Sequence, residues 1–119
     1  MKIYLKEWKL QEMNFSIIKS DERKEDMFDM KTSQGFPIGD KKSFNLLFEV
    51  KIRDIDFDMS MSMLAIFGLD EEITEEFKVS DFPKINAPAI AFPYLRALIS
   101  NITLQAGFKP VMLPSINFV

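Results

Sequence analysis

The 119-residue sequence contains no cysteine and no histidine, and only four glycines. Without cysteine the chain has no disulfide, no thiolate nucleophile and no thiolate metal ligand. Without histidine it lacks the commonest general base and the commonest metal ligand. The glycines stand far apart, so no glycine-rich loop is present to hold a phosphate. These absences predict a protein that uses no metal and no cofactor. Catalysis by Asp, Lys and Tyr alone is possible, but the sequence assembles no such site, so we expect a protein that is not an enzyme.

Charge and hydropathy exclude two further classes. The 15 basic residues are outnumbered by 18 acidic ones, which leaves a net charge of −3 and no basic excess for a nucleic acid backbone. No apolar run approaches the roughly 18–20 residues of a membrane span. Residues 1–7 carry charge before any apolar signal-peptide region develops. We therefore expect a single cytoplasmic domain that binds no nucleic acid and inserts into no membrane.

The clearest pattern is an alternation of apolar and polar residues over 42–52. Its apolar members are Phe44, Leu46, Phe48, Val50 and Ile52. A second alternation follows at once, with Ile55, Phe57, Met59, Met61 and Met63. A period of two indicates a half-buried strand, and Arg53 and Asp54 leave room only for a tight reversal. The two strands should form an antiparallel hairpin, and residues 64–67, apolar on both faces, should be covered on both.

Two weaker strands are predicted before this hairpin. Residues 25–32 alternate over a short stretch, and Met13, Phe15 and Ile17 alternate with polar residues near the N-terminus. The run 19–26 between them is dense in both charge signs, which predicts a solvated turn.

Helical signals replace this alternation in the last third of the chain. Residues 70–77 predict a short helix with acids near its start, and Pro83 should then break regular structure. Asn86 is a candidate N-cap for a long helix over 86–106, with Gly107 at the C′ position.

The predicted architecture is therefore one α+β domain. It has a four-stranded antiparallel sheet over about 1–67, a linker with a short helix over 70–85, a main helix over about 86–106, and an extended segment over 107–119.

The long helix is apolar over most of its surface. One stripe contains Ile90, Tyr94, Leu98 and Ile102. An adjacent stripe contains Phe92, Leu95 and Ile99. One sheet face does not cover so wide an apolar surface, so a second copy or another partner should cover the outer stripe, which we take to be Phe92, Leu95 and Ile99. Tyr94 and Arg96 should lie at that interface, where Arg96 either pairs with a carboxylate, Glu49 and Asp81 being candidates, or faces solvent.

Two groups of carboxylates resemble a catalytic or metal site in composition alone. Asp56 and Asp58 share one strand face, which an amphipathic strand exposes to solvent in any case. A solvated helix face accounts for a second acidic cluster, which lacks the alternating ligand spacing of a calcium loop; its members are Glu71, Glu72, Glu75 and Glu76.

Residues 87–96 read APAIAFPYLR, and residues 107–118 read GFKPVMLPSINF. These two stretches resemble motifs of the SecB family of protein-export chaperones. The first is similar to the opening of that family's main helix, and the second resembles its Gly-Phe-Pro-rich segment ending in an Asn-Phe pair. Upstream, residues 48–52 fit the family's third strand, and Ile66 and Phe67 fit the end of its fourth.

The resemblance implies a fold, an assembly and a function. Members of the family have a four-stranded antiparallel sheet with a long helix and assemble as a dimer of dimers, a tetramer with the helices sandwiched between. They are ATP-independent holdases that keep unfolded preprotein clients in apolar grooves until the translocation motor SecA accepts them. The chain stops at Val119, where the family usually continues into a further helix and a polar tail, so we do not carry over the SecA contacts of that region.

Two alternatives stay open. Short SecB-like proteins also serve toxin–antitoxin systems, which implies a chaperone dedicated to one partner such as an antitoxin. The other alternative is an oligomeric interaction protein that is not a chaperone.

A client site is predicted where apolar residues gather beyond the needs of the sheet core. Extended clients need apolar grooves bordered by accessible backbone. Folding back of the helix should bring three such groups to one edge of the sheet, with prolines at 83, 110 and 114 holding the linkers open. The three groups are the strand end (Ile66, Phe67, Leu69), the link before the helix (Val79, Phe82, Ile85) and the segment after it (Phe108, Val111, Met112, Leu113).

Overall fold

The computed structural model describes residues 1–18 and 25–119 of the chain. These residues form two compact units, 1–73 with the strands and 74–119 with the helices. The turn predicted over 19–26 lies largely outside the described residues.

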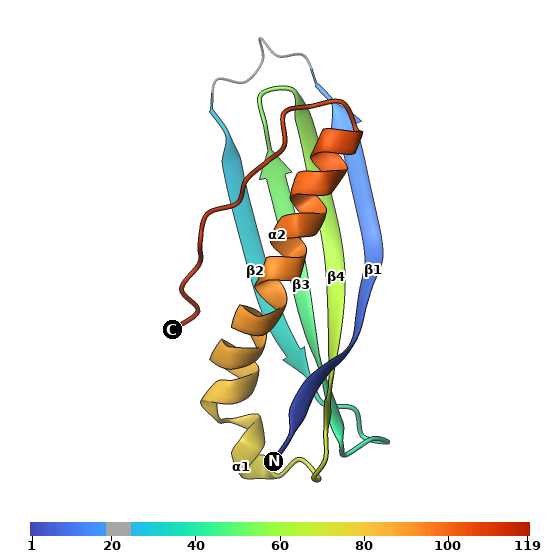
Figure 1. Cartoon of the computed structure of the whole chain (residues 1–119), viewed down its shortest axis with the longest axis vertical. Coiled ribbons are helices and arrows are strands. Elements are labelled where there is room, and N and C mark those ends of the chain that lie inside the picture. The colour runs from blue at the N-terminus through green and yellow to red at the C-terminus, as the bar shows by residue number, and fades with distance from the viewer. Residues whose placement is uncertain (19–24) are drawn as a thin grey trace. The chain divides into compact units, whose positions relative to one another are not determined.

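The first unit is a four-stranded antiparallel sheet (Figure 1). Its strands are β1 (Ile3–Ile17), β2 (Met27–Gly35), β3 (Ser43–Arg53) and β4 (Phe57–Leu69). Their order across the sheet is β1-β4-β3-β2, so β2, β3 and β4 form a meander and β1 pairs with the far side of β4. The four antiparallel strands predicted from the alternating segments are confirmed.

The β3–β4 hairpin places its apolar side chains on one face. Phe44 lies opposite Phe67, and Val50 opposite Met61. The rings of Phe44 and Phe67 stack with centroids 5.1 Å apart. Because side chains alternate along both strands, every apolar residue of this face becomes part of one buried layer, which includes Phe44, Leu46, Phe48, Val50, Ile52, Phe57, Met59, Met61, Met63, Ala65 and Phe67.

The connection within this hairpin is longer than predicted. Strand β4 begins at Phe57, and the backbone N–H of Asp54 donates to the Phe57 carbonyl at 2.9 Å. Asp54 also accepts a side-chain hydrogen bond from the backbone N–H of Asp56, at 3.2 Å. This carboxylate-stabilised turn includes Ile55, which is 40% exposed rather than an inward strand residue.

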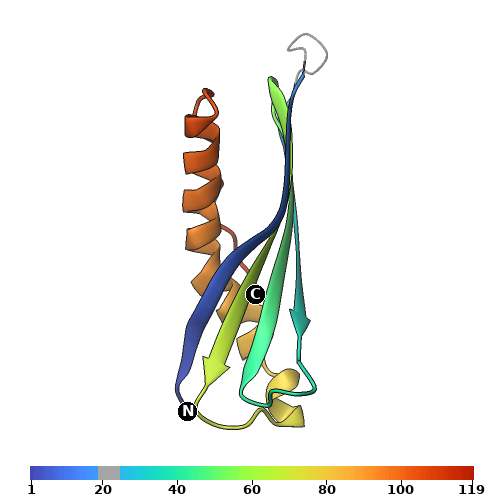
Figure 2. The same cartoon turned by 90° about the vertical axis from the view of Figure 1, so that its right-hand side faces the viewer.

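Strand β1 keeps an apolar face only because it is bulged twice. The register shifts between Leu5 and Glu7 and again between Leu10 and Glu12. Each bulge adds one residue, so side chains spaced by three in the sequence still face the same way and lie opposite odd-numbered residues of β4, as Leu5, Trp8, Leu10 and Met13 do. Figure 2 shows the pronounced curvature of this strand.

The opposite face of the sheet also carries apolar side chains near the end of β4. Leu64 and Ile66 are half-buried there, as expected for a stretch that is apolar on both faces. The ring of Tyr4 lies over Gly68, so closely that a Cβ at Gly68 would stand 2.5 Å from the ring carbon Cζ. The missing side chain of the glycine therefore makes room for the tyrosine.

The second unit opens with a helix shorter than predicted. Helix α1 (Glu75–Lys78) begins after Thr74, whose hydroxyl accepts a hydrogen bond from the backbone N–H of Phe77 at 3.1 Å. The threonine is a better N-cap than the acidic residues before it, which lie outside the helix.

The main helix starts differently from the prediction and ends as predicted. A π-helical turn, η2 (Phe82–Asn86), runs directly into α2 (Ala87–Gln105). Pro83 therefore does not break regular structure, because the first helical turn tolerates proline. Asn86 has helical φ and ψ of −72° and −44° and makes no capping hydrogen bond, so its predicted role is wrong.

Glycine closes α2 in a Schellman motif. Gly107 has a φ of +97°, a conformation that other residues rarely adopt. Its N–H donates to the Leu104 carbonyl at 3.1 Å, and the N–H of Phe108 donates to the Thr103 carbonyl at 3.0 Å. These two bonds satisfy the last helical carbonyls and turn the chain back.

Phe67 tests the buried layer of the sheet. Phe67→Ala removes a fully buried ring that stacks on Phe44, so the free energy of unfolding in urea should fall by about 3–5 kcal/mol. Ile38→Ala is the control, because Ile38 is 98% exposed and its loss should change stability by less than about 0.5 kcal/mol. A Phe67→Ala variant as stable as the parent would contradict this packing.

Candidate functional site

The C-terminal segment 108–119, which we call the C-terminal strap, runs back along α2 (Figure 1). The backbone N–H of Val111 donates to the Thr103 hydroxyl oxygen at 2.9 Å. That hydroxyl in turn donates to the Ile99 carbonyl at 2.9 Å. Thr103 is fully buried, so one threonine links the helix backbone to the strap through both functions of its hydroxyl group.

Two further contacts hold the strap along the helix, and Leu113 of the strap is buried, at 3% exposed. Ser100 Oγ donates to Met112 Sδ at 3.6 Å. The rings of Phe118 and Phe92 meet edge to face with centroids 5.7 Å apart. Since Thr103, Ser100 and Phe92 follow in reverse order along the chain, the strap is antiparallel to α2.

A groove lies between the helix and the strap. This strap groove has a volume of 280 Å³ and is mainly apolar, with lining residues Pro93, Arg96, Ala97, Ser100, Met112 and Leu113. Among the described residues, no backbone–backbone hydrogen bond involves residues 109–119. The groove is therefore bordered by backbone that pairs with no other strand. The N–H groups of Val111 and Val119 bond to side chains, and the other backbone groups of the segment are available for the pairing that strand addition requires.

The structure separates the link before the helix from the strap. Val79 follows α1 and is 71% exposed, and Phe82 and Ile85 are half-buried in η2. The rings of Phe77 and Phe82 lie 6.1 Å apart. Phe82 and Ser100 are about 27 Å apart along the helical axis, at about 1.5 Å per residue. These two predicted groups thus lie at different levels of α2 and do not meet.

The strand-end group belongs mostly to the sheet core. Phe67 is fully buried and Leu69 is 3% exposed. Ile66 points to the other face of the sheet and is half-buried, opposite Asn45 and Glu7. Of this group, Ile66 alone presents its side chain away from the buried layer.

The apolar stripes of α2 are distributed differently from the expectation. Leu95 and Ile99 are fully buried and Phe92 is 5% exposed. The exposed large apolar residues of the helix are Ile90, Tyr94 and Leu104, at 45%, 53% and 54%. The outer stripe therefore contains Tyr94 but not the other three apolar residues that we assigned to an interface.

Arg96 lines the strap groove. Within the described part of the chain, Arg96 forms no ion pair with a carboxylate. Pairing across an interface between chains stays a prediction.

Sequence reasoning missed Thr103. The buried stripe of α2 repeats every fourth residue through Ala91, Leu95, Ile99 and Thr103. A signal was present in the sequence, because this spacing of four continues the stripe through the threonine. The stripes predicted from apolar residues alone left Thr103 out, so the face expected to be buried differed from the observed one.

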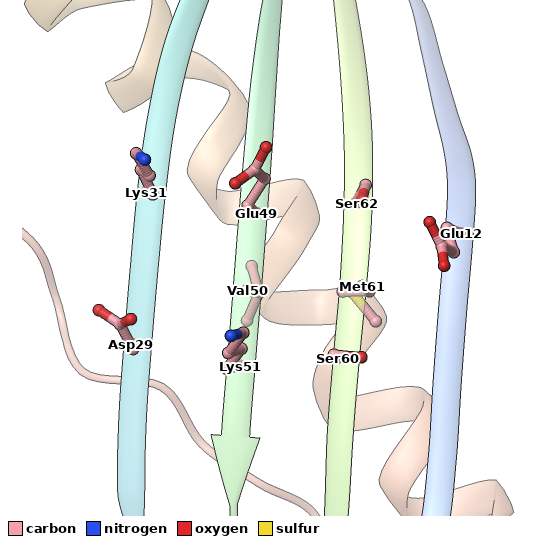
Figure 3. A pocket seen from close by; sticks show the side chains of 9 residues that line it. All are labelled: Glu12, Asp29, Lys31, Glu49, Val50, Lys51, Ser60, Met61 and Ser62. Atoms are coloured by element: carbon pink, nitrogen blue, oxygen red, sulfur yellow. The ribbon is translucent and has the colours of Figure 1, made fainter.

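A second hollow lies on the face of the sheet opposite the buried layer (Figure 3). It has a volume of 410 Å³ and a polar lining that includes Glu12, Asp29, Lys31, Glu49, Lys51, Ser60 and Ser62. Opposite charges face each other across the strands, Asp29 with Lys51 and Lys31 with Glu49. This alternation is typical of a solvated sheet face. No group of three acidic residues in the described ranges is placed to hold a metal ion.

One carboxyl group has a perturbed proton affinity. The backbone N–H of Lys42 and the hydroxyl of Ser43 donate to Asp40 at 2.9 Å each, and together with the charge of Lys6 they lower the pKa of Asp40. These hydrogen bonds close the turn before β3. The shift therefore marks a structural turn and no catalytic group.

The sheet order and the single long helix define a known class of fold. A SecB-like chaperone of Mycobacterium tuberculosis, Rv1957, solved in complex with a ChAD peptide from the HigA1 antitoxin, matches 97% of this chain and 90% of its own with a TM-score of 0.73. Sequence identity is 11%, so this likeness shows the fold alone. No helix among the described residues is long and apolar enough to cross a membrane.

The family follows from the sequence comparison. The family model for SecB, preprotein translocase subunit SecB, matches residues 1–119. The chain belongs to the SecB family.

Individual relatives agree with this assignment. The protein-export protein SecB of Magnetococcus marinus is 29% identical over 133 residues, covering 99% of this chain and 77% of that protein. The SecB of Anaplasma phagocytophilum is 47% identical over 63 residues, covering 52% of this chain and 40% of that protein. An uncharacterized protein of Methanocaldococcus jannaschii is 48% identical over 59 residues, covering 50% of this chain and 37% of that protein. The matched segments thus span about two fifths of the length of these last two relatives.

Thr103 tests how the strap is held. Thr103→Val keeps the shape but removes the acceptor for the Val111 N–H. Loss of this buried hydrogen bond should lower the free energy of unfolding by about 1–2 kcal/mol and speed amide exchange at Val111 about tenfold. Thr103→Ser retains the hydroxyl and should keep the amide protected. Equal exchange rates in all three proteins would show that the threonine does not anchor the strap.

Proposed function

We propose that this chain is an ATP-independent chaperone, a holdase, that binds extended segments of unfolded or preprotein clients and keeps them competent for translocation. The observation that carries the proposal is the strap groove, in which an apolar surface lies beside extended backbone without backbone pairing. Membership of the SecB family and the SecB-like fold support it. A holdase of this kind is not an enzyme and works without a cofactor, in the cytoplasm.

The binding step uses two forces that do not depend on the client's sequence. Open N–H and C=O groups of the strap pair with an extended client as a neighbouring strand would. Apolar client side chains bury area against Phe108, Val111 and Met112 of the strap. Each fully buried Val, Leu or Phe side chain contributes roughly 1.5–3 kcal/mol. Several weak contacts of this kind hold a client by mass action, and ATP is unnecessary because dilution or a tighter acceptor reverses them.

A long client reaches beyond the strap groove. Val79, Phe82 and Ile85 provide a second apolar contact at the start of α2, and Ile66 is a separate candidate contact within the sheet unit. Phe67 and Leu69 are buried within the sheet unit and Leu113 within the helix unit, so these three support client binding only indirectly.

Substitutions of exposed residues in the strap groove and at the start of α2 can test client binding without changing the stability of the fold. Met112 and Val79 are 72% and 71% exposed, so Met112→Ser and Val79→Ser should leave the melting temperature nearly unchanged while client affinity falls about three- to tenfold. Anisotropy of a labelled unfolded client measures the affinity. Ile38→Ser is the control, because Ile38 is exposed in a loop outside these surfaces. Unchanged affinity in both site variants would place the client groove elsewhere.

A dedicated partner is the second candidate. The structural neighbour Rv1957 was solved with a peptide from an antitoxin, and the same fold in this chain would suit one such client. A refolding competition decides between the two: a general holdase slows the refolding of several unrelated proteins, whereas a dedicated chaperone acts on one. Transfer of a bound client to SecA, measured with the purified motor, tests the export role separately.

We also propose that the chain assembles as a dimer of dimers. The exposed apolar side chains Ile90, Tyr94 and Leu104 form the outer face of α2, and water-exposed apolar stripes of this width mark protein contacts.

Leu104 tests the assembly. Leu104→Glu places a charge in the outer stripe and should yield dimers or monomers by light scattering, because burying an unpaired carboxylate opposes association. Gln105→Glu adds the same charge one residue away and should leave the assembly intact. Leu95→Glu is unsuitable for this purpose, since Leu95 is fully buried and the variant should unfold. A wild-type chain that is monomeric at micromolar concentration contradicts the proposal.

A further inference from the structure

Methionine provides all the sulfur chemistry of this chain, which has eight methionines and no cysteine. Oxidation of a thioether requires access of the oxidant to the sulfur. Met59, Met61 and Met63 are at most 3% exposed, whereas Met112 is 72% exposed. Burial therefore protects the three methionines of β4 and leaves Met112 open to attack, with Met1, Met27 and Met13 less exposed, at 63%, 48% and 40%.

The residues around Met112 provide hydrogen-bond donors that a methionine sulfoxide could use. Ser100 Oγ donates a hydrogen bond to Met112 Sδ at 3.6 Å. Arg96, which lines the same groove, has five N–H donors. A thioether is only a weak acceptor, whereas a sulfoxide is polar. The groove thus places the Ser100 hydroxyl against the sulfur and a guanidinium in the same lining, and the sulfur accepts hydrogen bonds well only after it has gained an oxygen.

We propose that Met112 is a reversible oxidation site that regulates client capture, an inference that rests on the proposed holdase function. Hydrogen peroxide transfers one oxygen to Sδ: a sulfur lone pair forms the S–O bond, the O–O bond breaks, and the leaving hydroxide takes the proton of the transferred oxygen and departs as water. The sulfur loses two electrons, which the peroxide gains. A methionine sulfoxide reductase reverses the step with a dithiol, which becomes a disulfide while the oxygen leaves as water.

Oxidation changes the strap groove in two ways. The apolar edge formed by Met112 becomes polar, which removes area that a client would bury. The new oxygen accepts hydrogen bonds from the Ser100 hydroxyl and the Arg96 guanidinium, which draws the strap toward α2 and narrows the groove. Both changes lower the affinity for apolar segments, so the oxidised chain releases its clients and the reductase restores capture.

The first experiment follows the modification itself. The full chain is treated with dilute hydrogen peroxide, and peptide mass spectrometry records the sulfoxide at each methionine over time. Met112 should oxidise at least about tenfold faster than Met59, Met61 and Met63, and faster than Met27, which is 48% exposed. Oxidation of Met27 before Met112 overturns the proposal, whatever the function of the chain.

The second experiment measures the position of the strap. Amide exchange at Val111, whose N–H is held by Thr103, should slow about threefold on oxidation, because the sulfoxide binds the strap to the helix. Ser100→Ala removes one donor and should reduce this slowing. Faster exchange after oxidation, or an equal response in Ser100→Ala, contradicts the geometry proposed for the sulfoxide.

The third experiment links the modification to client binding by comparing each protein with itself before and after peroxide. The wild type and Met27→Leu should both lose about tenfold in affinity for a labelled unfolded client. Met112→Leu, whatever its starting affinity, should show no change. A peroxide effect that persists in Met112→Leu overturns the regulatory role. If the untreated wild type binds no client, the holdase function fails, while the oxidation rates and amide exchange still decide whether Met112 is the modified site.

Discussion

The register of the β3–β4 hairpin determines which face of the sheet is apolar, and the other strands must conform to it. Phe44 faces Phe67 and Ile52 faces Met59, and the pairs at every second position between them lie on the same side. Leu47 and Leu64 are the one apolar pair of the hairpin on the other face. Side chains alternate along a strand, so a slip of one residue would move this whole set to the polar face. The length of the hairpin therefore makes its register specific, and β1 and β2 stabilise the fold only where their apolar side chains match it.

This dependence explains which strands the sequence could predict. The hairpin itself is regular, so its period of two is visible without further information. In β1 the side chains on the same face are those of Leu5, Trp8, Leu10 and Met13, which are separated by three, two and three residues. The extra residues belong to bulges, which depend on pairing with β4. Sequence alone thus revealed only the unbulged part of β1, after Met13.

The main helix shows a different limit of sequence reasoning. Its end was predictable, because glycine at C′ has a local physical cause. Its beginning was not, since Pro83 terminates a helix from within but is accepted in a first turn. The buried stripe was misplaced for a third reason: Thr103 satisfies its hydroxyl within its own helical turn and with the strap, so a polar residue occupies a fully buried position. Chemical type alone did not reveal that pairing.

The strap combines two requirements that usually conflict. A surface for unfolded clients needs open backbone and exposed apolar side chains, yet a segment with both features tends to collapse onto itself or detach. Here Thr103 holds the strap through a single backbone N–H, and prolines at 110 and 114 prevent it from forming regular structure.

The neighbouring residues Met112 and Leu113 have different roles, because successive side chains of an extended chain point to opposite sides. Leu113 is buried and Met112 is exposed. The rigid, branched leucine anchors the segment to its own protein, whereas the flexible methionine, which adapts its shape to varied partners, faces outward. A surface that binds many clients needs both kinds of side chain. The anchoring residue must fit one fixed site in its own protein, whereas the residue that contacts clients must pack against side chains of many shapes.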